Sequence, residues 1–173
     1  MEVNNIKRML GTKFIQLGIA YTKDAISDIE KVSKPQQFIR GSLSNFGMAI
    51  SFLDDEYYTT SFDNWKKIIE VMNPIGQSFK WEKEIFDCDN RAMLMSALIP
   101  AMYGLTMCSA CYCQVFNAHT GKEIGWHYNN LIIDKDGNIY LWDLDNNFQV
   151  QKITNNTPIM GNWKYNLSSI RMF

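Results

Sequence analysis

The sequence predicts an α+β protein in which helices come first and an antiparallel sheet follows. Residues 1–32 and 61–72 place apolar side chains at helical intervals. From Leu105 onward, β-branched and aromatic residues occur in short runs that turn residues separate. Helices followed by a run of strands are typical of the α+β class. We therefore expect N-terminal helices packed on a C-terminal antiparallel sheet.

Length and composition indicate a single folded domain. The chain has 173 residues, of which 46% are hydrophobic and 20% charged, and both shares are ordinary for a globular protein. One core of this size is expected, rather than two. We treat residues 1–173 as one domain, with a mainly helical part over 1–85 and a further helix followed by the sheet over 86–173.

The charge balance limits the classes of partner. A net charge of -1 and a pI near 6.1 give no basic surface for nucleic acid and no polybasic patch for a membrane. The polar start of the chain has no apolar segment typical of a signal peptide. No run approaches the roughly 18 apolar residues of a spanning helix. We therefore expect a soluble, cytoplasmic protein.

The N-terminal half contains clear helix boundaries. The helical pattern of residues 1–32 is interrupted at Ser33-Lys34-Pro35, because proline cannot continue a helix. Glycine and serine make residues 38–53 irregular. Ser61 is a typical helix cap, and Asn73-Pro74-Ile75-Gly76 is expected to end the helix that it starts.

A further helix is predicted over residues 89–98. Polar residues that commonly cap helices, at 87–90, precede a largely apolar run at 93–99. Pro100 and Gly104 are expected to mark its end.

The remaining sequence predicts an antiparallel meander. Turn residues recur between the runs, and Asp136-Gly137 is a strong hairpin signal. The predicted strands cover residues 106–116, 126–133, 139–144 and 148–153, and residues 163–173 form a last strand or a tail.

Cys88 is the candidate nucleophile. It lies where the helix predicted over residues 89–98 starts, and a helix N-terminus favours thiolate over thiol. His127 and Asp143 lie on neighbouring strands of the predicted hairpin. Asp145 would share the face of Asp143 if the strand continued, and we take Asp143 as the acid. A papain-type site needs this combination: the helix presents a thiol, the sheet a base, and an acid orients the imidazole.

Two aspartates oppose ionisation of the candidate nucleophile. Asp87 and Asp89 flank Cys88, and like charge disfavours a thiolate. A helix end contributes only about 0.3–1 kcal/mol at exposed positions. We therefore expect either an ion pair between Cys88 and a protonated His127, or a divalent cation that neutralises the aspartates.

Other polar clusters have simpler explanations. A zinc site of Cys108, Cys111, Cys113 and His119 would lack the usual paired spacing, so we expect these cysteines in the core. Residues 134–138 resemble the start of a calcium loop, but the glycine that such a loop requires is replaced, so a turn is expected. Two glutamines, Gln77 and Gln114, are candidate donors to an oxyanion.

Three motifs carry a resemblance to a known family. They are Asp87-Cys88-Asp89-Asn90-Arg91-Ala92, His127-Tyr128-Asn129-Asn130, and the run from Asp134 to Asp143. They resemble the papain-like C-terminal domain of fungal Marasmius-type agglutinins and related bacterial and phage proteins. The resemblance implies a papain-like or transglutaminase-like core, with Cys88, His127 and Asp143 as catalytic residues and Asn130 in a supporting role. It also implies calcium, for which Asp87 and Asp89 are the candidate ligands.

Together these observations predict a papain-like cysteine hydrolase, a peptidase or amidase acting on a peptide or protein substrate. Acyl transfer by the same triad is an open variant of that chemistry. The alternative is a non-catalytic binding or interaction protein on the same fold, such as a phage or host factor. No lectin repeat accompanies the motifs, so sugar binding is not expected from the resemblance.

Overall fold

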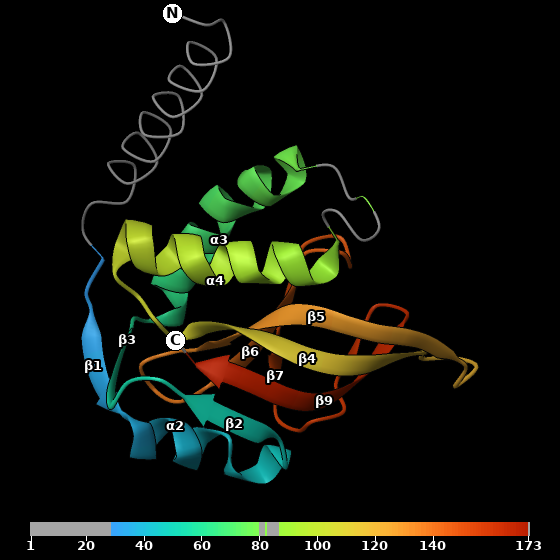
Figure 1. Cartoon of the computed structure of the whole chain (residues 1–173), viewed down its shortest axis with the longest axis horizontal. Coiled ribbons are helices and arrows are strands. Elements are labelled where there is room, and N and C mark those ends of the chain that lie inside the picture. The colour runs from blue at the N-terminus through green and yellow to red at the C-terminus, as the bar shows by residue number, and fades with distance from the viewer. Residues whose placement is uncertain (1–28, 80–81, 83–86, 173) are drawn as a thin grey trace, which may run out of the picture.

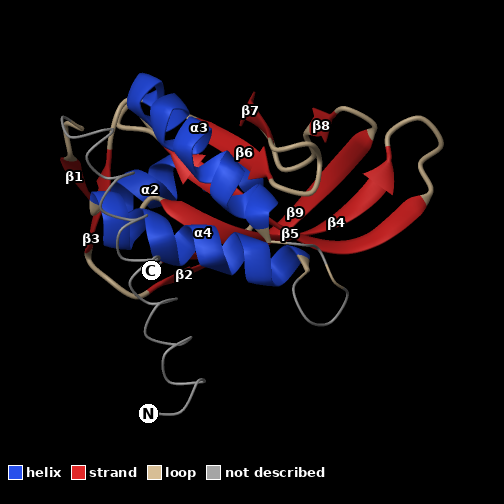
Figure 2. Ribbon diagram, turned by 90° about the horizontal axis from the view of Figure 1, so that it is seen from above, coloured by secondary structure: helices blue, strands red, loops and turns tan. Residues whose placement is uncertain are grey.

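The computed structural model describes residues 29–79, 82 and 87–172 (Figures 1 and 2). Of the helical pattern predicted over residues 1–32, residues 1–28 lie outside the described residues, as do residues 80–81 and 83–86 of the connection before Cys88. The described helices are α2 (Gln36–Ser42), α3 (Phe62–Ser78) and α4 (Cys88–Tyr103), with a short 3-10 helix at Ser44–Phe46. The described strands are β1 (Val32–Pro35), β2 (Ala49–Phe52), β3 (Glu56–Thr59), β4 (Cys108–Asn117), β5 (Glu123–Ile133), β6 (Ile139–Asp143), β7 (Gln149–Ile153), β8 (Ile159–Met160) and β9 (Trp163–Met172).

Most strands belong to one sheet. Its order is β2-β9-β4-β5-β6-β7, and β8 pairs with β9. All of these pairs are antiparallel except β2 with β9, which run parallel. β1 and β3 form a separate antiparallel pair. The predicted mixture of helices and a largely antiparallel sheet is therefore confirmed, while a papain-like core is not confirmed.

The N-terminal part contains more strand than the sequence pattern indicates. Residues 32–59 hold three short strands besides α2, whereas the sequence predicts a mainly helical N-terminal part with irregular structure over residues 38–53. Each of these strands has only four residues, too short for a clear alternation of apolar and polar side chains. Pairing with β9 and between β1 and β3 determines their conformation, since strand formation depends strongly on tertiary context.

Both long helices continue past the prolines that were expected to end them. α3 includes Pro74, and α4 includes Pro100 and ends at Gly104, whose N–H donates to the carbonyl of Pro100 at 2.8 Å. Each helix is fixed by its buried residues, which outweigh the cost of the proline. Within the described chain, neither helix nor any other is both long and apolar enough to span a membrane.

α4 lies across the sheet over β4 and β5, with α3 beside it (Figure 2). Its buried side chains include Met95, Ile99 and Met102, which belong to one core with the inner residues of the sheet. Asn130 of β5 fastens the helix to the sheet: its Nδ2 donates to the carbonyl of Ala92 at 2.9 Å and to Oγ of Ser96 at 3.0 Å. The helix start is thereby held in a defined position above the strands.

Replacement of Ile99 by alanine tests this packing. Ile99 is fully buried, so Ile99→Ala should lower the free energy of unfolding by about 2–5 kcal/mol. Urea unfolding followed by circular dichroism measures the change. Met93→Ala is the matched control, because Met93 lies on the same helix and is 40% exposed. An equal loss in the two variants would contradict the described packing of α4.

Candidate functional site

Cys88 is the first residue of α4 and is half-buried. The helix starts in a capping box, in which the side chain of Asp87 accepts from the backbone N–H of Asn90 and the side chain of Asn90 accepts from that of Asp87. Asp89 lies in the first turn, and its Oδ1 accepts from the N–H of Asn90 at 2.8 Å. The polar residues before the apolar run thus fix where the helix begins, and with it the position of the thiol.

His127 and Asp143 form a buried pair. Nε2 of His127 lies 3.0 Å from Oδ2 of Asp143, and Asp143 is fully buried. The same oxygen accepts from the hydroxyl of Tyr165 at 2.7 Å. The other carboxylate oxygen accepts from the backbone N–H groups of Asp145 and Asn146 at 2.8 and 3.2 Å. Asp143 is therefore saturated with donors and holds the imidazole in one orientation.

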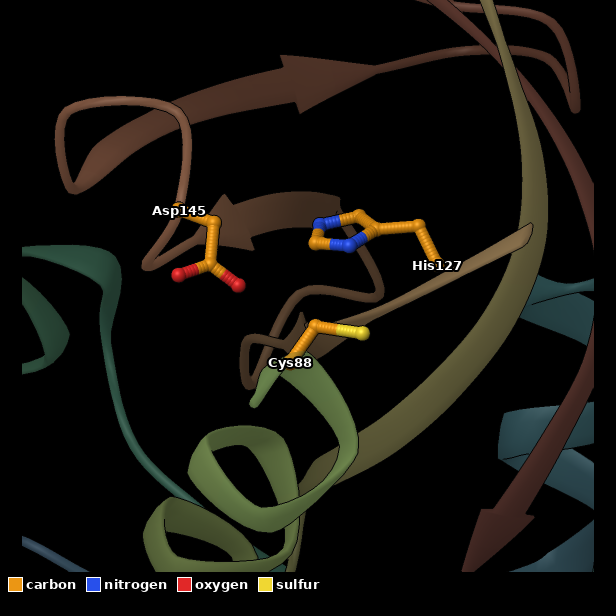
Figure 3. A group of neighbouring side chains, drawn as sticks. All are labelled: Cys88, His127 and Asp145. Atoms are coloured by element: carbon orange, nitrogen blue, oxygen red, sulfur yellow. The ribbon is translucent and has the colours of Figure 1, made fainter. Parts of the chain in front are cut away.

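The thiol, the imidazole and a further carboxylate meet at one point. Sγ of Cys88, a ring nitrogen of His127 and a carboxylate oxygen of Asp145 all lie within 4.8 Å of one another (Figure 3). Because Nε2 of His127 is occupied by Asp143, Nδ1 is the nitrogen available to Cys88. The structure therefore brings Cys88, His127 and Asp143 together and adds Asp145, which follows the end of β6.

The surroundings of His127 favour its charged form. Burial lowers the pKa of the imidazole, but hydrogen bonds to Asp143 and Cys88 outweigh it and raise the pKa to about 10. The expected pairing of Cys88 with a protonated His127 is in keeping with this direction.

Arg91 is a site residue that motif reasoning did not select. Its Nη1 donates to Oδ1 of Asp145 at 2.7 Å, and its Nη2 donates to the carbonyl of Phe79 at 2.8 Å. Burial raises the pKa of Asp145, and the positive charges of Arg91 and His127 oppose that shift. The sequence did contain a signal for Arg91. It follows Cys88 by three residues on one helix, and this spacing places its cation on the same side of the helix as the thiol.

These side chains open onto a cleft of about 760 Å³. Its walls combine aromatic rings, amides and charged groups. The lining residues are Gln77, Cys88, Arg91, Trp126, His127, Leu144, Asp145, Asn147, Phe148 and Trp163. Gln77 thus lies in the wall of the cleft, whereas Gln114 does not. A volume of this size lies within the range of small-molecule sites.

Calcium at Asp87 and Asp89 has limited support from the donors nearby. Both carboxylates accept from backbone N–H groups of their own helix turn, and a hydrogen bond with Asp87 raises the pKa of Asp89. Calcium takes six to eight oxygen ligands. Among the described residues, the cluster able to hold a metal includes sulfur and nitrogen instead. Calcium binding at Asp87 and Asp89 stays a prediction.

The other candidate clusters are structural. Cys108, Cys111 and Cys113 are buried, and burial raises the pKa of each thiol. The ring of His119 is instead on the surface, where its Nε2 is hydrogen-bonded to Oδ1 of Asn162 at 3.1 Å. Asp134 organises the predicted turn by accepting from the N–H groups of residues 136 and 138 at 2.9 Å.

The comparisons with known proteins concern the fold. No family model and no curated protein matches the chain. A solved structure described as a PSL1a–E64 complex matches with a TM-score of 0.54 at 14% identity, over 81% of this chain and 51% of that chain. Polyporus squamosus lectin, bound to the human-type influenza-binding epitope Neu5Aca2-6Galb1-4GlcNAc, also matches with a TM-score of 0.54 at 14% identity. The match covers 81% of this chain and 49% of the lectin chain. The chain is thus similar in fold to a fungal agglutinin-type lectin and spans about half the length of these solved chains.

These neighbours contradict the prediction of a cysteine peptidase or amidase. The two solved structures reported above are of an agglutinin-type lectin, which favours the non-catalytic binding protein that the sequence left as the alternative. A peptide substrate is not supported either. The hydrolase prediction was wrong because the spacing of the motifs indicates only which polar side chains lie close together, and not which chemistry they perform. A thiol, an imidazole and a carboxylate in contact are equally compatible with a binding site.

The pairing of His127 with Asp143 has a consequence for pH dependence. The pKa of His127 is raised to about 10 from 6.5, so its proton stabilises the fold fully below pH 6.5, and this contribution disappears as the pH rises through about 10. Asp143→Asn removes the carboxylate and should lower the pKa. Titration of the His127 imidazole by nuclear magnetic resonance measures this pKa. An unchanged pKa in the variant would contradict the pairing of His127 with Asp143.

Tyr165 tests the hydrogen bonds around Asp143 without changing its charge. Its hydroxyl donates to Asp143 at 2.7 Å and accepts from Nδ2 of Asn146 at 3.0 Å. Tyr165→Phe should therefore cost about 1.5–3 kcal/mol of unfolding free energy. Tyr58→Phe, at a ring that is 43% exposed, is the control and should change little. Chemical denaturation of both variants gives the comparison.

Proposed function

We propose that this protein is a non-catalytic binding protein that holds a carbohydrate in the cleft beside Cys88 and His127. The observation that carries the proposal is the composition of the cleft wall, which contains both aromatic rings and planar polar groups. A sugar ring presents hydroxyl groups at its edge and C–H groups on its faces. It therefore matches a wall of this kind better than a purely apolar ligand does.

Trp126 is the main aromatic element of the wall. Its side chain is 55% exposed, although its ring stacks on Tyr112 with centroids 4.8 Å apart and planes 12° apart. Tyr112 in turn contacts Tyr128 at 4.8 Å. A large aromatic ring held this firmly and still exposed is suited to stacking against a ligand, because little side-chain entropy is lost on binding.

Trp163 contributes a second ring. It lies edge-on to His127, with centroids 5.5 Å apart and an interplanar angle of 87°. Phe148 also lines the cleft, and its backbone has a positive φ of 57°. Positive φ is uncommon for an aromatic residue, so the turn after β6 holds this ring at the cleft under backbone strain.

The polar groups of the cleft favour neutral sugar hydroxyls. The charge of Arg91 already pairs with Asp145 at 2.7 Å, and that of a protonated His127 with Asp143 at 3.0 Å. Gln77 and Asn147 add neutral amides to the wall, which can donate to and accept from hydroxyls. The lining thus offers paired charges and amides, a set that suits an uncharged saccharide better than a sugar carboxylate.

The lectin neighbours support a sugar ligand through the fold alone. This chain spans about half of each of those chains, so the match does not assign the sugar-binding part of the lectin to the shared half. The proposal therefore depends on the cleft of this protein. We also propose the papain-like or transglutaminase-like core as the finer description of the fold, because the start of α4 meets β5 at Cys88 and His127.

The state of the cysteines supports a reducing compartment. All four cysteines are described, and all four are free. Free thiols are typical of proteins in the cytoplasm, where disulfides are rare. We therefore propose the cytoplasm as the place where this protein binds its ligand.

Binding of defined saccharides tests the proposed function. The disaccharide Galβ1-4GlcNAc and its sialylated form are titrated into the full chain by isothermal calorimetry. We expect the neutral sugar to bind at least as tightly as the sialylated one, because the cleft has no unpaired cation among its described lining residues. Trp126→Ala should weaken binding by about tenfold, or about 1.4 kcal/mol.

Ile124→Ala is the matched control. Ile124 lies on the same strand and is 53% exposed, but it does not line the cleft. It should bind sugar as the unmodified protein does. Absence of binding by either saccharide, together with absence of binding across a panel of neutral glycans, would overturn the proposal. Equal weakening by the two substitutions would place the ligand elsewhere.

A further inference from the structure

We propose that Cys88, His127 and Asp145 form a zinc site at the floor of the cleft. These residues provide one sulfur, one nitrogen and one oxygen donor. Each is a donor type that zinc binds, and zinc sites with an open fourth position have three protein ligands. The proposal goes beyond carbohydrate binding and holds whether or not the cleft takes a sugar.

The geometry requires little rearrangement. Zinc–ligand distances of about 2.0–2.3 Å in a tetrahedron separate the ligand atoms by about 3.3–3.6 Å. The corresponding atoms already lie within 4.8 Å of one another. They come from the start of α4, from β5 and from the turn after β6 (Figure 3). Rotation of the half-buried Cys88 and Asp145 side chains would close the remaining distance.

The surroundings orient the donors as a metal site requires. Histidine ligands usually give their second ring nitrogen to a carboxylate, which fixes the ring and strengthens the ligand. Nε2 of His127 is bound to Asp143 at 3.0 Å, so Nδ1 is left for the metal. Asp143 is itself held by Tyr165 and two backbone N–H groups. The imidazole is therefore fixed by a second layer of contacts.

Arg91 determines which oxygen of Asp145 is available. Its guanidinium binds Oδ1 at 2.7 Å, which leaves Oδ2 for a metal. One thiolate and one carboxylate balance the charge of a divalent cation. Sulfur and nitrogen donors favour zinc over calcium and magnesium, which prefer oxygen. The fourth position would face the cleft, where water or a ligand group could occupy it.

Cobalt and zinc binding to the full chain test this site. Cobalt reports on its ligands, because a bound thiolate gives a charge-transfer absorption and tetrahedral coordination gives intense visible bands. We expect one cobalt per chain, with both features, and displacement by an equimolar amount of zinc. Cys88→Ser should abolish the thiolate absorption. Asp143→Asn should weaken zinc binding by about 10–100-fold.

Two controls separate this site from other metal binding. His119→Ala removes the second of the two histidines, which is exposed, and should leave the cobalt spectrum unchanged. Asp89→Asn alters the aspartate pair beside Cys88 without removing a proposed ligand and should also leave it unchanged. Circular dichroism confirms that each variant is folded.

Three outcomes would overturn the proposal. They are no cobalt or zinc binding at micromolar metal, a full thiolate absorption in Cys88→Ser, and loss of the spectrum in His119→Ala. If Asp143→Asn fails to fold, Cys88→Ser still decides the matter, because a half-buried cysteine is replaced there by an isosteric residue. Sugar binding that persists in a protein without a metal site would leave the proposed function intact.

Discussion

The buried carboxylate of Asp143 is the interaction on which the site depends. It accepts hydrogen bonds from a histidine, a tyrosine and two backbone N–H groups, and these donors come from β5, from β9 and from the turn that follows β6. A buried carboxylate without such partners would be costly. The network therefore links three segments of the chain. Loss of one donor leaves the buried negative charge of Asp143 with fewer hydrogen bonds to compensate it.

A second constraint places the helix relative to this network. Asn130 bonds to the backbone and to Ser96 of α4, so the helix cannot slide along the sheet without breaking buried hydrogen bonds. Cys88 is fixed in turn by the capping box at the helix start. The meeting of Cys88 with His127 thus follows from two sets of backbone contacts. Asn130 supports the site through the position of α4, since both hydrogen bonds that its Nδ2 donates go to that helix.

Periodicity and turn chemistry predicted much of the C-terminal half. The hairpin at Asp136-Gly137 and the strands on either side are those of the structure, because their signals are local. The strands β1 to β3 could not be predicted, since their pairing partners lie far away in the sequence or in equally short segments. Asp145 and Arg91 were similarly hard to select: the first lies beyond the end of a strand, and the second meets it only in the folded chain.

The function was harder to predict than the site because one set of contacts fits several chemistries. A thiol beside a charged imidazole and a carboxylate is compatible with a catalytic nucleophile, with a metal site and with the polar part of a ligand-binding cleft. What distinguishes them is the rest of the cleft. Trp126 is rigid and more than half exposed, and Arg91 is already neutralised by Asp145. These features are the basis for proposing a polar, ring-shaped ligand, and Trp126 lies outside the motif that first drew attention to Cys88.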